Sequence, residues 1–380
     1  MKKAIWVVVI LVIIGIIVGM NRDKKVEPMV ETGPIKIGVL LPLTGDAASY
    51  GEPGQKMYQI ATEEINASGG INGRNLELIV EDSKCSGKDA TNAAQKLINT
   101  DHVQVIIGGL CSSESLAVAP IAATAKVTLF SPGSSNPGLT GINEYFARDY
   151  PSDSSQGKIL ADIAFNDKNY KKVAFIQEQT DYASGVYKAF NDEFIRLGGT
   201  IVKEEFPTSN TDFRSALTKL KDTKPDVLFI NTQTPASASR VLAQFQQLKW
   251  KVAIIINDAI SGDPETISKN VTVLEGALTA QFGIDMTNQK FQDMIAKYKT
   301  KFGAEPPYQS YAQTEYDAVY ILKDAIAAVG NDGTKVAAWL RTVKDWQGAS
   351  GSVTIGSDGD RVGGHTPLMV KGGKVVAYTK

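Results

Sequence analysis

Small hydroxyl residues follow two apolar runs in the first half of this 380-residue chain. Ser112 comes after the run at residues 103–107, and Ser135 comes after the run at residues 127–130. The intervening residues 114–125 carry Ala, Leu and Ile at helical spacing, so the pattern predicts strand, loop, helix, strand and loop. In a parallel sheet both loops would lie at the carboxyl edge, where open α/β sheets bind ligands. Their hydroxyls and backbone N–H groups would suit a ligand carboxylate, although small residues also serve simply to allow tight turns.

A second set of polar and aromatic side chains follows apolar runs elsewhere in the chain. Tyr182, Gln233 and Asp258 each come shortly after such a run, and Tyr50 lies in the first predicted loop. If two α/β units face each other by their carboxyl edges, these side chains line one cleft. A lone carboxylate at Asp258 would suit an ammonium group, and a carboxylate with an ammonium describes an α-amino acid. The alternative is that Asp258 caps the helix that follows it.

The sequence shows no recognisable catalytic or metal-binding motif. It lacks a G-x-G-x-x-G spacing after its first predicted strand, a G-x-x-x-x-G-K-[ST] phosphate loop and a G-x-S-x-G nucleophile elbow. Its two histidines are His102, ahead of a predicted strand, and His365, in a Gly-rich stretch that predicts a turn. The net charge is −1 without long runs of one sign, which argues against a nucleic-acid surface. We therefore expect a binding protein with no catalytic residues, metal ion or cofactor.

Alternating strands and helices must position these loops, in the order that is typical of a doubly wound α/β sheet. The predicted strands are residues 35–41, 76–80, 103–107, 127–130, 172–177, 200–204, 226–230, 252–256, 353–355, 366–370 and 374–377. The predicted helices are residues 55–67, 88–100, 114–125, 185–197, 213–221, 235–248, 289–302, 311–329 and 334–343. The alternation occurs twice along the chain, which predicts two lobes of related α/β architecture.

The chain is expected to cross between these lobes three times. The apolar rhythm breaks at residues 145–157, and further crossings are predicted near residues 278–282 and 346–352. Three crossings would form a hinge that permits lobe closure. The expected division is residues 34–150 plus 280–348 for lobe one and residues 151–279 plus 349–380 for lobe two.

The N-terminus differs from the rest of the chain. Lys2 and Lys3 precede a continuous apolar run at residues 4–20. As a helix this run would be roughly 25 Å long, at the short end for crossing a bilayer. Since no A-x-A motif ends it, we favour an uncleaved membrane anchor at residues 1–20 over a cleaved signal peptide. The polar residues 21–33 would form a tether.

Each of the two cysteines follows a predicted strand, Cys85 after residues 76–80 and Cys111 after residues 103–107. If these strands are parallel neighbours, both cysteines lie at the same sheet edge, close enough to form a disulfide. Two free buried cysteines are the alternative. The bridge would close a loop of about 27 residues and contribute roughly 3 kcal/mol of stability. Because it needs an oxidising compartment, it agrees with the signal-like N-terminus in placing the protein outside the cytoplasm.

The chain from about residue 35 to its end resembles the type I periplasmic solute-binding proteins, specifically the branched-chain amino-acid (Leu/Ile/Val) receptors of ABC transporters. The motifs that carry this resemblance are IGVLLPLTGDAASYG, NASGGINGRNLELIVEDSKC, IIGGLCSSES, SPGSSNPGLT, DSSQG and YDAVYILKDAI. The resemblance implies two Rossmann-like lobes joined by a three-strand hinge and closing around a ligand. It also implies a disulfide between Cys85 and Cys111.

The resemblance implies roles for residues of lobe one. Ser112, directly after the second cysteine, matches a serine that binds the ligand carboxylate. Gly133 matches a backbone carbonyl that binds the ligand amine, and Ser135 matches a hydroxyl, usually of threonine, that binds the ligand. Tyr50 matches a tyrosine that borders the side-chain pocket.

Lobe two supplies the remaining residues implied by the resemblance. Tyr182 matches a ligand-binding tyrosine. Asp258 stands where the leucine receptors have a glutamate that binds the amine. Gln233 stands near a second tyrosine of those receptors, so the chain departs from their pattern in the region that governs side-chain selectivity.

These features together predict a monomeric, membrane-tethered receptor that captures an amino acid, branched-chain or otherwise apolar, and delivers it to an ABC permease. Related receptors bind amides, urea or aromatic acids, and these ligands are the first alternative. A ligand-sensing ectodomain is the second alternative, although the chain encodes no cytoplasmic signalling domain.

Overall fold

The structure is a computed structural model that describes residues 33–380, of which residues 34–380 form one compact unit. The predicted anchor at residues 1–20 and the predicted tether, except for Gly33, lie outside the described residues. Within residues 33–380, no helix is long and apolar enough to cross a membrane.

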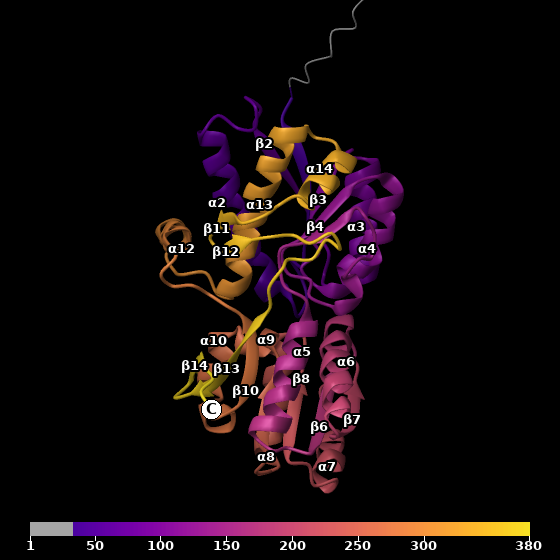
Figure 1. Ribbon diagram of the computed structural model, residues 1–380, viewed down its shortest axis with the longest axis vertical. Helices are drawn as coiled ribbons and strands as arrows, with labels where there is room; N and C mark the ends of the chain where they lie inside the picture. Colours follow the sequence, from indigo (N-terminus) through magenta and orange to yellow (C-terminus); the bar gives the residue numbers. More distant parts are fainter. Residues whose placement is uncertain (1–32) are drawn as a thin grey trace, which may run out of the picture. The chain divides into compact units, whose positions relative to one another are not determined.

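Lobe one is built on a five-stranded parallel sheet with the order β2-β1-β3-β4-β5. Its strands are β1 (Ile35–Leu41), β2 (Leu76–Asp82), β3 (Val105–Ile107), β4 (Thr128–Ser131) and β5 (Phe146–Arg148). Its helices are α2 (Ala48–Ala67), α3 (Gly87–Asn99), α4 (Ser112–Ala125), the 3-10 turn Pro137–Leu139, α12 (Gln289–Phe302), α13 (Gln309–Val329) and α14 (Gly333–Leu340) (Figure 1). A two-stranded hairpin, β11 (Trp346–Gly348) with β12 (Gly351–Val353), completes the lobe.

Both faces of this sheet are buried, because successive side chains along a strand point to opposite faces. Ile37 and Val39 of β1 belong to a core that includes residues of α2, α12, α13 and α14. Leu40 belongs to a second core with residues of α3 and α4. A strand covered on both faces reads as a continuous apolar run, which is why β1 is predictable from the sequence.

Lobe two is built on a seven-stranded sheet with the order β14-β13-β10-β9-β8-β6-β7. The strands are β6 (Lys172–Glu178), β7 (Thr200–Phe206), β8 (Val227–Asn231), β9 (Ala253–Ile256), β10 (Leu278–Phe282), β13 (His365–Lys371) and β14 (Lys374–Ala377). The helices are α5 (Asp153–Asp162) with a π-helical extension Ile163–Asp167, α6 (Asp181–Arg196), α7 (Arg214–Asp222), α8 (Pro235–Gln247), α9 (Asp258–Ser261), α10 (Pro264–Lys269) and α11 (Val271–Leu274). Strands β6 to β10 run parallel, whereas β13 and β14 are antiparallel additions at one edge.

The same alternation covers the sheet of lobe two. Phe175 of β6 and Phe229 of β8 stack at 4.4 Å in a core that includes residues of α5 and α6. Ile176 and Ile230 of the same strands face the opposite core, with residues of α7 and α8. In both lobes, the loops that follow the parallel strands lie at the carboxyl ends of those strands.

The crossings between the lobes differ in part from the prediction. The predicted division begins the second part of lobe one at residue 280. However, β10 is a strand of the lobe-two sheet, paired with β9 and β13, so the second crossing between the lobes comes after Phe282. The crossing predicted at residues 346–352 is wrong, because these residues form the lobe-one hairpin β11–β12. Asp317 of α13 holds its turn by accepting hydrogen bonds from the backbone N–H groups of Ala349 and Ser350, each at 2.7 Å.

The third passage lies later in the chain. Val353 and Ile355, which the predicted division places in lobe two, lie in the core of lobe one. The chain joins the lobe-two sheet only where β13 begins, at His365. In Figure 1 the yellow segment between β12 and β13 runs from one lobe to the other.

The first helix also begins earlier than predicted. α2 begins at Ala48 and not at residue 55, so Tyr50 lies on a helix and not in a loop. The Gly and Pro residues of this stretch predict a loop. Two of the glycines are instead helical residues at positions where the helix packs too closely against its neighbours for a side chain. A Cβ at Gly51 would lie 2.0 Å from the carbonyl oxygen of Pro42, and one at Gly54 would lie 2.5 Å from Oε1 of Glu315.

Candidate functional site

A small cavity lies between the two lobes. Lobe one and lobe two both contribute side chains to it, from loops and helix starts at the carboxyl ends of their parallel strands. The lining residues are Tyr50, Leu110, Cys111, Ser112, Gly133, Ser135 and Tyr311 from lobe one, and Tyr182, Gln233 and Ala259 from lobe two.

The first part of the lobe-one surface is the start of α4. Ser112 is the first residue of this helix, and its hydroxyl accepts a hydrogen bond from the backbone N–H of Asn136 at 3.2 Å. Oε2 of Glu114 accepts from the backbone N–H of Cys111 at 2.9 Å, which fixes the entry into the helix. Because free N–H groups and the helix dipole favour anions at this end, the position suits a ligand carboxylate.

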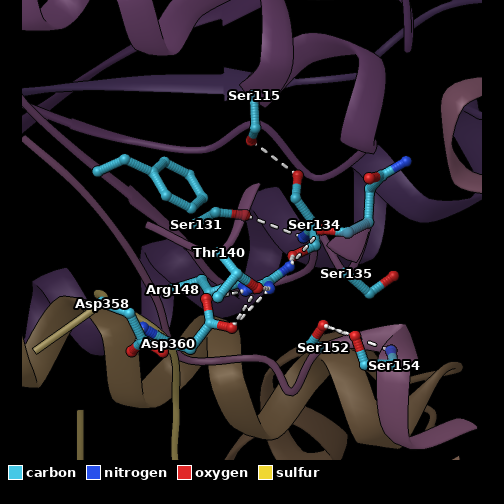
Figure 2. Close-up of polar contacts among 12 residues, drawn as sticks. Ser115, Ser131, Ser134, Ser135, Thr140, Arg148, Ser152, Ser154, Asp358 and Asp360 are labelled. Atoms are coloured by element: carbon cyan, nitrogen blue, oxygen red, sulfur yellow. Dashed lines mark hydrogen bonds and ion pairs between the residues drawn. The ribbon is translucent and has the colours of Figure 1, made fainter. Parts of the chain in front are cut away.

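The second part is the loop after β4, which carries Gly133 and Ser135. We call Ser112, Gly133 and Ser135 the serine wall. Nη1 of Arg148 donates to the backbone carbonyls of Ser134 and Asn136, at 3.2 and 2.9 Å, and its guanidinium is paired with Asp360 (Figure 2). A Cβ at Gly133 would lie 2.4 Å from Cδ1 of Leu110, so a larger residue there would force the Leu110 side chain to shift.

Lobe two closes the cavity from the other side. The hydroxyl of Tyr50 donates to the backbone carbonyls of Gln233 and Ala259, at 3.3 and 3.4 Å. Nε2 of Gln233 lies 2.9 Å from Sγ of Cys85. Arg240 of lobe two forms an ion pair with Asp46 of lobe one at 2.9 Å. These contacts cross between the lobes and describe a closed arrangement.

Asp258 lies beside the cavity and is held by two tyrosines. It is not among the lining residues and is 1% exposed. The hydroxyl of Tyr182 donates to its Oδ1, and the hydroxyl of Tyr150 donates to its Oδ2 at 2.9 Å. The alternative of a helix cap is wrong, because Asn257 caps α9 by accepting from the backbone N–H of Ile260 at 3.2 Å.

A second buried carboxyl group, Asp153, lies close to Asp258. The hydroxyl of Ser135 donates to Oδ2 of Asp153 at 2.7 Å. Burial, and then the negative charge of Asp258, raise the pKa of Asp153 well above its ordinary value. Burial also opposes ionisation of Asp258, but hydrogen bonding and the charge of His365 outweigh it and lower the pKa of Asp258. The pKa values of the two carboxyl groups are therefore shifted in opposite directions, and Asp258 is the group that ionises first as the pH rises.

His365 corrects a sequence-based prediction. The sequence predicts a Gly-rich turn here, but His365 is the first residue of β13 and its side chain is fully buried. Its Nε2 lies 3.6 Å from Oδ2 of Asp258 and 3.8 Å from Oδ1 of Asp153. The antiparallel pairing of β13 with β10 brings it there, and no local pattern in the sequence reports that pairing.

The remaining predicted residues are brought together as expected. All of the predicted binding residues except Asp258 line the cavity. Sequence reasoning missed Leu110, Ala259 and Tyr311 in the lining, and Tyr150, Asp153 and His365 behind Asp258. Two of these carried a usable signal, since Leu110 precedes Cys111 and Asp153 opens the DSSQG motif.

The predicted disulfide is confirmed. Cys85 and Cys111 are bonded, with their Cα atoms 5.3 Å apart, and β2 and β3 both pair with β1. The two strands are therefore not immediate neighbours, but the cysteines follow them at the same edge of the sheet. The bridge ties the loop after β2 to the residue before Ser112.

Known proteins with related sequences and structures share this architecture. A family model described as periplasmic binding protein matches residues 34–372. The Leu/Ile/Val-binding protein BraC3 of Rhizobium johnstonii is 28% identical, with 90% of this chain and 93% of that protein covered. The crystal structure of the leucine-binding protein LivK from Thermotoga maritima is 30% identical, covers 91% of this chain and 98% of that chain, and gives a TM-score of 0.83. LivJ from Streptococcus pneumoniae, solved with isoleucine, is 28% identical over 90% and 98% of the two chains, with a TM-score of 0.80.

Proposed function

The chain belongs to the periplasmic binding protein family, and from this premise we propose that it is the solute receptor of an ABC transporter for an α-amino acid, branched-chain or otherwise apolar. The amino acid is held between the two lobes and is then delivered to the permease. The family consists of receptors and not of enzymes, in agreement with the sequence-based expectation.

One observation carries this proposal, namely that the cavity lies between a surface suited to an anion and a surface that holds an ionised carboxylate. The serine wall offers hydroxyls and the N-terminus of α4. Asp258, held next to the cavity by Tyr182, offers a negative charge. A zwitterion placed between them would pair both of its charges, and a buried charge is costly unless it is paired.

The side chain of the ligand would meet aromatic rings. Tyr50 and Tyr311 both line the cavity, with ring centroids 5.8 Å apart, and Leu110 adds an aliphatic contact. The names of the relatives, which bind Leu, Ile and Val, leucine or isoleucine, support an apolar side chain. Gln233 adds a polar amide to this lining and would tune the choice among such side chains.

The place of action follows from the family and from two features of the chain. The Cys85–Cys111 bridge favours an oxidising compartment. The apolar run at residues 4–20 supports a membrane anchor and residues 21–33 a tether. A tethered receptor works at high local concentration near its permease. A monomer is the simplest form that meets these requirements, because both walls of the cavity come from one chain.

The direct test is a ligand screen by thermal shift, followed by calorimetry, on the purified protein against each amino acid, urea and simple amides. A true ligand stabilises the folded state by mass action, by about 2.7 kcal/mol at a hundred times its Kd. We expect stabilisation by leucine, isoleucine or valine. Stabilisation by none of the amino acids would overturn the proposal.

A second candidate function is favoured by the state of Asp258. Both of its carboxylate oxygens already accept a tyrosine hydrogen bond, and it is separated from the cavity lining. A solute without an ammonium group, such as an amide, urea or an aromatic acid, would not need Asp258. Binding of such a solute in the screen, without binding of any amino acid, would establish this alternative.

A further inference from the structure

Three side chains of lobe two lie together behind the cavity: Asp153, Asp258 and His365, which we call the buried group. They are the first residues of α5, α9 and β13. One nitrogen or oxygen atom of each lies within 4.8 Å of those of the other two. The side chains of Asp153 and His365 are fully buried, and that of Asp258 is 1% exposed. Because all three residues belong to lobe two, the group does not depend on lobe closure.

Nε2 of His365 is a buried atom with no hydrogen-bond partner in the described part of the chain. It lies 3.6 Å from Oδ2 of Asp258 and 3.8 Å from Oδ1 of Asp153. These distances are too long for hydrogen bonds, and a buried polar atom without a partner is costly. The atom is therefore placed to bind a further group that lies between it and the two carboxyl groups.

The second ring nitrogen of His365 has a partner of the kind that metal-binding histidines use. Nδ1 lies 2.7 Å from Oγ of Ser155, and this hydroxyl donates to the backbone carbonyl of Ser152 at 3.0 Å. A metal ion at Nε2 selects the tautomer with the proton on Nδ1, which Ser155 can accept as a hydrogen bond. Such a bond to the other nitrogen orients the ring in most histidine-metal sites.

Neighbouring hydroxyls also orient the two carboxyl groups. Tyr150 and Tyr182 donate to Asp258, one to each oxygen. Ser135 donates to Oδ2 of Asp153 at 2.7 Å. Each carboxylate oxygen can accept more than one bond, so these contacts still allow a bond to a metal ion. They are the outer partners that hold carboxylate ligands in position.

The charges of the buried group call for a cation. The buried arginines at the crossings, Arg148 and Arg361, form their ion pairs with other residues. Burial, and then the negative charge of Asp258, raise the pKa of Asp153 well above its ordinary value. A divalent ion would displace the proton that this carboxyl group otherwise keeps. With two carboxylates and a neutral imidazole it would form a set without net charge, as a buried site requires.

We propose that Asp153, Asp258 and His365 bind a divalent transition-metal ion such as Zn²⁺, through two carboxylate oxygens and Nε2. Zinc accepts this donor set, with bonds of about 2.0–2.2 Å. In a tetrahedral arrangement these bonds place neighbouring ligand atoms roughly 3.4 Å apart. The distances of 3.6 and 3.8 Å from Nε2 to the carboxyl oxygens approach this value, so small rotations of the side chains suffice.

This inference goes beyond the proposed function and does not depend on it, because metal binding can be measured without an amino acid. The sequence predicts no metal site, since the three residues lie far apart and form no motif. The two proposals meet at Asp258, which would pair either with the metal ion or with the ammonium group of the ligand. Zinc is therefore expected to lower the affinity for leucine, and this expectation alone rests on the proposed function.

The test is calorimetric titration of the full-length protein, freed of metal by a chelator, with Zn²⁺ in the absence of amino acids. We expect one zinc ion in the buried group. Loss of an outer partner alone lowers metal affinity by about 10- to 100-fold, so His365→Gln, which removes a ligand, should weaken binding by about tenfold or more. His102→Asn is the matched control, because it changes an exposed histidine in a left-handed position that asparagine tolerates. It should bind zinc like the wild-type protein.

The control variant also provides a measurement that does not require His365→Gln to fold. His102→Asn leaves His365 as the single histidine of the chain, so its imidazole NMR signals can be followed directly. Zinc is expected to shift these signals, and a chelator should restore them.

The outcomes separate the two proposals. The metal site is wrong if no zinc binds, if His365→Gln binds zinc as tightly as the wild-type protein, or if the His365 signals do not shift with bound zinc. The receptor assignment stands in each of these cases. If no amino acid binds, the proposed function fails and the zinc titration still decides the metal site. Bound zinc that leaves the affinity for leucine unchanged would overturn the shared use of Asp258.

Discussion

The serine wall and the buried group of Asp153, Asp258 and His365 lie at the same cavity, but they are assembled in opposite ways. The serine wall comes from one short stretch of lobe one, between Ser112 and Ser135, and its groups are neutral. The second group joins Asp153, Asp258 and His365, which lie far apart in the sequence and bring two carboxyl groups and an imidazole together. The first depends on adjacent strands of one sheet and the second on the third crossing between the lobes.

The difference shows which kind of binding surface can be formed by residues that are close together in the sequence. Hydroxyls and backbone N–H groups need only the right loop geometry, so one strand–helix–strand unit can supply them. A buried charge needs a counter-ion and full hydrogen bonding, and these come from wherever the fold brings suitable groups. We therefore expect the two regions to respond differently to substitution.

The largest effect should come from the residue that holds the serine wall from behind. Arg148→Met removes a fully buried guanidinium that binds two loop carbonyls and leaves Asp360 without its partner. We expect a loss of roughly 3–5 kcal/mol in the free energy of unfolding, measured by urea denaturation. Arg196→Met is the matched control, because the Arg196 side chain that pairs with Glu193 is 63% exposed, and the substitution should cost under about 1 kcal/mol. Equal losses in both variants would contradict the bracing role.

The disulfide ties the serine wall to the neighbouring loop, so breaking it is the next test. Replacing Cys85 and Cys111 together by Ser should lower the free energy of unfolding by roughly 2–4 kcal/mol, measured by the same denaturation. A reductant should reproduce the effect in the wild-type protein and have no effect on the double variant. A reductant that lowers the stability of both proteins equally would show that it acts elsewhere.

Asp258→Asn tests the charged side. The variant keeps the shape of the side chain but removes the charge that would pair with the ligand ammonium, so amino-acid affinity should fall at least tenfold, or about 1.4 kcal/mol. Isothermal calorimetry measures this, with the exposed Asp285→Asn as the control. Affinity that is unchanged in Asp258→Asn would remove this residue from the site.

The smallest effect should come from a single hydroxyl of the serine wall. Ser112→Ala removes one neutral hydrogen-bonding group, worth about 1 kcal/mol, or roughly fivefold in Kd. The loss should be the same for leucine and for 4-methylpentanoic acid, the leucine analogue without the amine, because the Ser112 hydroxyl would contact only the carboxylate of the ligand. Ser113→Ala is the matched control, since that hydroxyl bonds to the carbonyl of Cys85 at 3.1 Å and is outside the cavity lining. A loss confined to leucine would contradict the division of labour between the two regions.

The same contrast explains what the sequence could predict. The two-lobe α/β fold and the serine wall follow from apolar runs and from the residues directly after them, because both are local. The sequence predicts a crossing at residues 346–352, but the structure has a lobe-one hairpin there. This prediction fails because the position of the segment depends on hydrogen bonds to Asp317, which is distant in the sequence. The glycines around His365 predict a turn, and only the pairing of β13 with β10 places this residue against Asp153 and Asp258.

The local origin of the serine wall has a consequence for the order of events in capture. Ser112, Gly133 and Ser135 all belong to lobe one, so this surface is complete before the lobes meet. Tyr182 and Asp258 belong to lobe two and reach the ligand only on closure. The ligand should therefore contact the first surface before closure, and its residence time should depend on the second surface, so that substitutions at Asp258 raise the dissociation rate.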